Sequence, residues 1–144
     1  MPRLACIIPV VGNTDGLDST LLSVLERRPD DCEMLVVLNV PYPDPYNLQG
    51  EIQILQAPPE TGLVGCVNIG MAATQAPIVH LLANGLEASE GWVESALVHF
   101  NDPRVAAVTP LIYGTTDRSL LLAAGVGYCR GGRKNPERTA VQSN

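Results

Sequence analysis

The sequence predicts an α/β fold: a Rossmann-like, mainly parallel sheet with helices on both faces. Two observations support this class. Short apolar segments alternate with segments of helical periodicity, and 46% of the 144 residues are hydrophobic while only 17% are charged. Because helices connect successive strands, right-handed crossovers and parallel strands are expected. The carboxyl ends of the strands over residues 3–10, 34–40 and 78–82 should then share one edge of the sheet.

The predicted strands are short, and Pro or Gly follows most of them. The first is ended by Pro9 and Gly12, and the cluster that begins at Pro41 leaves room for little or no helix after the second. The third, residues 51–55, alternates in polarity and is expected to be more exposed. The predicted strands cover residues 3–10, 34–40, 51–55, 78–82, 105–109 and 120–124.

Three helices are predicted from apolar residues at helical spacing. Asp15 or Asp18 is the candidate N-cap of the first, and Pro29 ends it. Trp92 opens the third and is expected to be a core anchor. The predicted helices cover residues 17–25, 63–71 and 92–100.

The cysteines are widely separated, form no CxxC pair and are accompanied by only two histidines. This pattern argues against a structural zinc site and is typical of reduced thiols in an intracellular protein. The N-terminus does not resemble a signal peptide and the apolar runs are too short to span a bilayer, so a cytoplasmic protein is expected. The cysteines are Cys6, Cys32, Cys66 and Cys129.

The charge is unevenly distributed along the chain. The net charge is −6, yet four of the nine Lys and Arg residues fall in residues 130–144. An acidic body with 4% aromatic residues lacks the electrostatic and stacking features of a nucleic-acid-binding protein. Residues 1–129 are therefore predicted to form a single domain, and residues 130–144 a flexible tail.

Pro, Asn and Gly recur where predicted strands end or helices begin. Pro9 and Asn13 bracket the end of the first strand, while Gly62, Asn68 and Gly70 mark the second helix. In this order they resemble the amino-terminal half of family 2 glycosyltransferases, enzymes of the GT-A fold that bind a nucleotide-sugar. The resemblance covers about residues 3 to 125.

The resemblance implies a site for a UDP-, GDP- or dTDP-sugar at the carboxyl edge of the sheet. Small residues at a helix start allow backbone N–H groups to approach a diphosphate, although close helix–sheet packing explains the same glycines equally well. The nucleotide-sugar-binding residues that the resemblance implies are Pro9, Val11, Asn13, Asn39, Gly62, Asn68, Ala83, Asn84 and Gly85.

The sequence departs from the family at its acidic positions. Leu38 replaces a carboxylate that binds the uracil ring, and Ala83-Asn84-Gly85 replaces the two carboxylates that hold Mn²⁺ or Mg²⁺. Glu87 is a weak candidate for a displaced metal ligand. Family members also continue for about another hundred residues that supply the acceptor site and the catalytic base, so no catalytic residue is assigned.

Two functions remain open from sequence alone. The first is a family 2-like donor-binding domain that has lost its acidic metal motif. The second is a catalytically inactive scaffold or partner-binding domain of the same fold. Another α/β nucleotide-binding enzyme has less support, because neither a GxGxxG fingerprint nor a P-loop is present.

Overall fold

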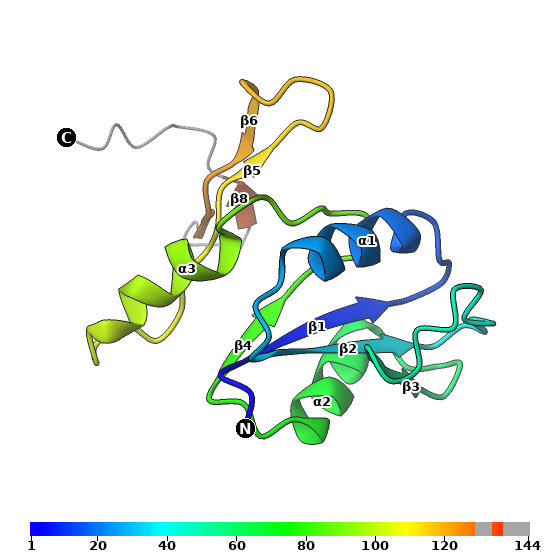
Figure 1. The fold of residues 1–144 in the computed structure, drawn as a ribbon. Helices are drawn as coiled ribbons and strands as arrows, with labels where there is room; N and C mark the ends of the chain where they lie inside the picture. The colour runs from blue at the N-terminus through cyan, green and yellow to red at the C-terminus, as the bar shows by residue number, and fades with distance from the viewer. Residues whose placement is uncertain (129–133, 137–144) are drawn as a thin grey trace. The chain divides into compact units, whose positions relative to one another are not determined.

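The computed structural model describes residues 1–128 and 134–136, which fall into two compact units (Figure 1). Unit 1 is Met1–Val93 and unit 2 begins at Glu94. Unit 1 contains every residue that the sequence assigned to a binding site. The prediction of one domain over residues 1–129 stays a prediction.

Unit 1 is built on a four-stranded parallel sheet. Its order is β3-β2-β1-β4, and all three strand pairs are parallel. The arrows of β1 and β2 in Figure 1 point the same way, so the carboxyl ends form one edge. This confirms the predicted fold class. The strands are β1 (Leu4–Val10), β2 (Cys32–Leu38), β3 (Gln53–Gln56) and β4 (Ile78–Leu81).

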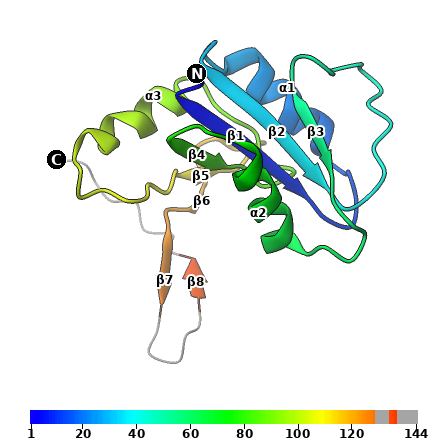
Figure 2. The ribbon, with the colours of Figure 1, turned by 90° about the horizontal axis from the view of Figure 1, so that it is seen from below.

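Two helices, α1 (Leu17–Arg27) and α2 (Leu63–Ala73), cover opposite faces of this sheet (Figures 1 and 2). All seven residues of β1 are buried, as expected for a strand covered on both sides. Ile7 packs in a cluster with Cys66 of α2. At Gly70, an added Cβ would lie 2.7 Å from Ile7 Cγ2, so this glycine lets α2 approach the sheet closely.

The predicted N-cap of α1 is wrong. Gly16 occupies that position with a φ of 78°, and no side chain caps the helix. Asp18 lies one residue inside the helix, in its first turn. A Cβ at position 16 would lie 3.0 Å from Gly85 Cα, so a capping side chain has no room there.

Unit 2 differs from the sequence-based prediction. The helix α3 (Trp92–Leu97) crosses into this unit and is followed by the 3₁₀ helix η1 (Val98–Asn101), so the third helix is shorter than predicted. The strand predicted over residues 105–109 is wrong, since these residues form neither strand nor helix. Three of the five residues are exposed. A short apolar run therefore does not form a strand unless a neighbouring strand pairs with it and buries its side chains.

The sixth predicted strand exists as β6 (Leu121–Ala123) but pairs antiparallel with β5 (Ile112–Tyr113), which was not predicted. A second antiparallel pair joins β7 (Val126–Tyr128) and β8 (Lys134–Pro136). Of the predicted tail, residues 130–144, only Lys134–Pro136 are described, and residues 130–133 and 137–144 lie outside the described residues. Its flexibility stays a prediction.

Three cysteines, Cys6, Cys32 and Cys66, are free and buried, and Cys129 lies outside the described residues. Burial raises the pKa of all three thiols, that of Cys32 to about 11, so they are protonated at neutral pH. Within residues 1–128 and 134–136, no helix has the length and apolar character needed to cross a membrane.

Candidate functional site

Asn39 joins the loops at the carboxyl edge of the sheet. It follows β2, and its Oδ1 accepts a hydrogen bond from the Gly12 N–H at 3.0 Å. Its Nδ2 donates to the carbonyl oxygens of Pro59 at 3.2 Å and Thr61 at 2.9 Å. One side chain therefore holds together the loops after β1, β2 and β3. Since both Nδ2 hydrogens are engaged, Asn39 would contact a ligand through this amine only by giving up a loop contact.

Gln56, which the sequence analysis missed, supports the same edge from the end of β3. Its Nε2 lies 3.0 Å from the carbonyl oxygen of Leu38 and donates to it. The Leu38 side chain is completely buried. A base bound at this edge would therefore meet loop residues rather than this leucine.

Three predicted site residues lie in β1 or in the loop that follows it, and two of them are at the surface. Pro9 is buried within β1, whereas Val11 and Asn13 are exposed. Asn13 Oδ1 accepts a hydrogen bond from the Asp15 N–H at 3.0 Å, and Gly12 has a φ of 86°. The chain thus turns sharply out of β1 and leaves Asn13 Nδ2 directed away from this local bond.

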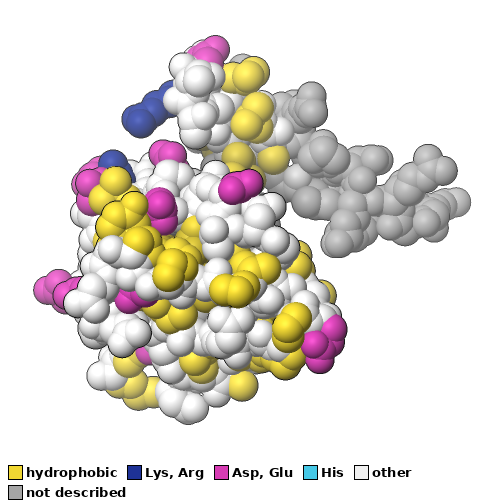
Figure 3. All heavy atoms as spheres, turned by 90° about the vertical axis from the view of Figure 1, so that its right-hand side faces the viewer, with side chains coloured by type: hydrophobic (Ala, Val, Ile, Leu, Met, Phe, Trp, Pro, Cys, Tyr) yellow, Lys and Arg dark blue, Asp and Glu magenta, His cyan; other side chains and the backbone are white. Residues whose placement is uncertain are grey.

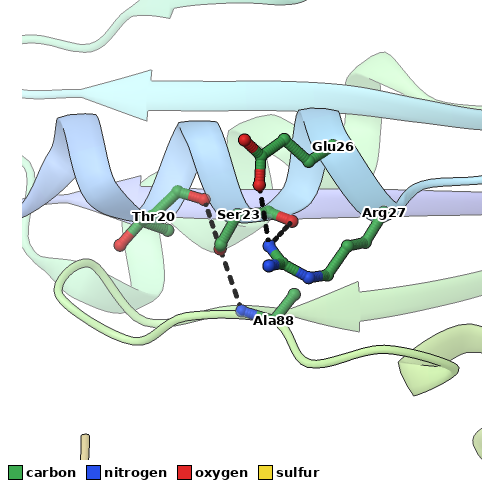
Figure 4. A network of polar contacts seen from close by, with 5 residues as sticks. All are labelled: Thr20, Ser23, Glu26, Arg27 and Ala88. Carbon is green, nitrogen blue, oxygen red and sulfur yellow. Dashed lines mark hydrogen bonds and ion pairs between the residues drawn. The ribbon is translucent and has the colours of Figure 1, made fainter.

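The loop after β4 is attached to α1 through two hydroxyl groups. The Gly85 N–H donates to Thr20 Oγ1 at 3.0 Å. The Ala88 N–H donates to Ser23 Oγ at 2.9 Å (Figure 4). Each hydroxyl in turn donates to a carbonyl of α1, Thr20 to Gly16 and Ser23 to Thr20. Residues 83–88 are therefore held along the helix.

Sequence reasoning did not identify Thr20 and Ser23 as site residues, although a signal exists. Both fall on the stripe of α1 that also contains the buried residues Leu17, Leu21 and Val24. Hydroxyl groups on a buried helix face need hydrogen-bond partners outside the apolar core. Here the backbone of the loop after β4 supplies them.

Asn84 lies at the centre of that loop. Its Nδ2 donates to the Asp15 carbonyl oxygen at 3.0 Å. Its Oδ1 is buried and accepts no hydrogen bond from any residue that the structure describes. The flanking Ala83 and Gly85 are exposed. The predicted triplet therefore lies at the edge of the sheet, and the amide oxygen of Asn84 can still accept a hydrogen bond.

The β4–α3 loop contains one carboxylate near the triplet, Glu87, which is exposed. Among the described residues, no group of three or more His, Cys, Asp or Glu side chains is arranged to hold a metal ion. Hard divalent cations prefer several oxygen ligands, most of them anionic. Asn84 and Glu87 alone do not fit that requirement.

The two predicted residues of α2 lie in different environments. Gly62 is the N-cap of the helix, next to Thr61, whose carbonyl oxygen Asn39 contacts. Asn68 lies more than a turn further along and is exposed. The structure therefore brings Gly62 together with Asn39 but places Asn68 on the outer surface of α2.

The comparisons with known proteins bear on this arrangement. No family model matches the chain. Pre-mycofactocin glycosyltransferases from two Mycobacterium tuberculosis strains, CDC 1551 / Oshkosh and ATCC 25618 / H37Rv, are 32% identical to it over 106 residues, 74% of this chain and 23% of each relative. The chain is a distant homologue of the family 2 glycosyltransferases. It spans about a quarter of the length of these curated relatives.

The fold of this glycosyltransferase homologue agrees with that relationship. The crystal structure of S. aureus TarS 1-349 matches it with a TM-score of 0.57 at 12% identity, covering 69% of this chain and 32% of that chain. The parallel sheet flanked by helices is of the GT-A type. This likeness bears on the fold alone.

The carboxyl edge of unit 1 in this chain is acidic. The three arginines of unit 1 lie at the opposite end of the sheet: Arg3 just before β1, Arg27 at the end of α1 and Arg28 directly after it. Figure 3 views the carboxyl edge, where hydrophobic side chains spread across the middle of unit 1 and acidic ones lie mostly around them. The carboxylates at this edge are Asp15, Asp44, Glu60 and Glu87 in the loops and Asp18 in the first turn of α1.

Two tyrosines of the β2–β3 loop contribute to this edge. Tyr46 Oη donates to Asp18 at 3.1 Å, and that bond raises the pKa of Tyr46. Burial, reinforced by Asp18 and Asp44, raises the pKa of Tyr42. Both phenols are therefore protonated at neutral pH and add no charge to the edge, and the O–H of Tyr46 is already donated to Asp18.

The two aromatic rings near the end of unit 1 are structural. His80 of β4 and Trp92 have ring centroids 4.8 Å apart. Burial lowers the pKa of His80, which favours the neutral imidazole. Trp92 is partly buried and is a ring partner of His80, and its role as a core anchor stays a prediction.

Proposed function

We propose that unit 1 is the nucleotide-sugar-binding half of a family 2-like glycosyltransferase whose acidic metal-binding motif is lost. The observation that carries this proposal is the gathering of loops around Asn39 at the carboxyl edge of the sheet, in a chain homologous to glycosyltransferases. Parallel α/β sheets bind ligands at this edge. The donor would be a UDP-, GDP- or dTDP-sugar.

The proposed ligand contacts come from the loops around this edge. Val11 and Asn13 supply an apolar surface and an amide, and Asn84 Oδ1 supplies a buried acceptor. Asn39 would position the loops through its side chain. The remaining proposed residues would act through backbone groups or lie farther from the edge, and they are Pro9, Gly62, Asn68, Ala83 and Gly85.

Loss of the metal motif has an electrostatic consequence. Positions 83 and 85 carry no carboxylate, and the loops at the carboxyl edge of unit 1 contain no Lys or Arg. A diphosphate at this edge would meet acidic side chains without a compensating cation. We therefore expect the base and ribose to supply most of the binding free energy.

The alternative is a catalytically inactive scaffold or partner-binding domain of the same fold. The acidic edge supports it, because that edge opposes an anionic ligand. Turnover would need a carboxylate base, and no residue has been assigned that role. The two proposals differ in one observable, the binding of a nucleotide.

Isothermal titration with uridine, UDP, GDP, dTDP and UDP-sugars, each with and without Mn²⁺, tests the proposal. We expect one nucleotide to bind weakly, with an affinity that Mn²⁺ does not increase. The corresponding nucleoside should bind with nearly the same affinity. Absence of binding up to millimolar ligand would favour the scaffold. Binding strengthened tenfold or more by Mn²⁺ would contradict the loss of the metal motif.

Two variants sharpen this experiment. Ala83→Asp returns one carboxylate to the β4–α3 loop and should make UDP binding respond to Mn²⁺. Ser89→Asp adds the same charge at an exposed position farther along the loop and should not. Equal responses of the two variants would argue against a donor site at residues 83–85.

A further inference from the structure

The outer surface of α2 is apolar and uncharged. Val64 and Met71 are 73% and 48% exposed. Leu63, the first residue of α2, is also 58% exposed, but at 100° per residue it lies on the side of Cys66 and Gly70. Between Glu60 and Glu87 the chain contains no Asp, Glu, Lys or Arg. A helix that is apolar all round is normally buried on all sides, so the exposed side of α2 has the composition of an interface.

Asn68 lies at the centre of that exposed side. The buried residues of α2 are Cys66 and Gly70, and at 100° per residue Asn68 points in the opposite direction. Val64 and Ala72, one turn before and after it, are also exposed. The Asn68 side chain forms no hydrogen bond with the residues that the structure describes.

The distribution of charge argues for the identity of the partner. Unit 1 carries eleven carboxylate side chains against three arginines, but none of these groups belongs to α2. A basic partner would find no countercharge on this helix. Two copies of the chain, both acidic, avoid close like-charge contacts if they meet through this uncharged surface.

We propose that α2 is a self-association surface on which a second copy of this chain docks, with the two helices antiparallel about a two-fold axis near Asn68. An amide carries both donors and an acceptor, so two Asn68 side chains facing each other satisfy one another. A single polar residue in an apolar helix contact also sets its register. This inference does not depend on nucleotide binding.

Analytical ultracentrifugation of the full chain from about 5 to 500 μM tests the proposal. A contact of three helical turns is smaller than a standard interface, so we expect a dimer that dissociates in the micromolar range. Val64→Glu places two like charges near the axis and should raise the dimer Kd at least about tenfold. Leu22→Glu is the matched control, because Leu22 of α1 is also an exposed apolar residue, 58% exposed against 73% for Val64, and it should leave the Kd unchanged.

A second variant tests the axis itself. Asn68→Cys, in a chain with Cys129→Ser, should form a reducible dimer under mild oxidation with diamide. Far-UV circular dichroism and thermal unfolding of each variant check that the fold is retained. Monomers at all concentrations, or equal effects of Val64→Glu and Leu22→Glu, would overturn the proposal. So would lipid-vesicle binding that Val64→Glu abolishes in a monomeric chain.

Discussion

Unit 1 and unit 2 use strands in different ways. In unit 1, β1 and β2 each run for seven residues, pair in parallel and bury almost every side chain. The strands β5 and β6 of unit 2 have two and three residues, pair antiparallel over a short connection, and leave Tyr113 and Leu122 46% and 45% exposed. Burial of apolar area dominates stability, so we expect unit 1 to contain most of the folding free energy.

The largest difference should come from truncating one apolar side chain in each unit. Ile7→Ala should lower the free energy of unfolding by about 2–5 kcal/mol, because Ile7 is completely buried between the sheet and α2. Leu122→Ala should cost less than about 1 kcal/mol. Urea unfolding measures both, and equal losses would show that the two units share the core.

Gly70 tests how tightly unit 1 is packed. Gly70→Ala should cost about 1–3 kcal/mol, because the new Cβ meets Ile7 Cγ2 at 2.7 Å. In an Ile7→Ala background the same change should be neutral or stabilising, since alanine favours a helix over glycine by about 1 kcal/mol. Gly62→Ala, whose Cβ would meet nothing within 4 Å, is the control. An additive double mutant would contradict this contact.

Ser23 tests the attachment of the β4–α3 loop within unit 1. Ser23→Ala removes the acceptor of the Ala88 N–H and should cost about 1 kcal/mol. Hydrogen exchange at the Ala88 amide should become faster. Ser19→Ala, which removes an exposed hydroxyl bonded only to the Gly16 carbonyl, should leave that exchange rate unchanged. Unchanged exchange in both variants would mean that the hydroxyl does not hold the loop.

The smallest expected effect is a pH dependence at His80. Burial lowers its pKa in the folded state, so the unfolded chain binds a proton more readily. Titration of His80 should therefore not change the free energy of unfolding above pH 6.5, about the pKa of the unfolded state, and should lower that free energy as the pH falls below this value. His80→Gln should flatten the stability profile between pH 7 and pH 5. A profile identical to that of the unmodified chain would exclude His80 as the cause.

The predictability of the fold followed the length and burial of each element. Apolar runs such as Leu4–Val10 are typical of buried parallel strands. The predicted bounds of the strands of unit 1 therefore agree with the observed bounds within a few residues. Residues 105–109 form a similar run of Val and Ala but pair with nothing. The short β5 gave no periodic signal, because two residues cannot show one.

The sequence predicted where the residues of the candidate site lie on the sheet, but not which contacts their side chains make. Sequence order placed Asn39 and Gly62 at one sheet edge, since parallel strands end together. It did not reveal that Asn39 bridges the loops, that Gln56 supports them, or that Asn68 faces outward. Those outcomes depend on side-chain directions that sequence spacing alone leaves open.

The sequence by itself determined that this chain is a parallel α/β protein in which the loops after the strands share one edge of the sheet, because hydrophobic periodicity and Pro and Gly positions act locally. Only the tertiary structure decided that Gly16 is the N-cap of α1 and that Thr20 and Ser23 hold residues 83–88. The close approach of Gly16 to Gly85 and these hydrogen bonds join residues about sixty-five or more positions apart. No local pattern encodes such contacts, since they form only when the sheet brings distant loops together.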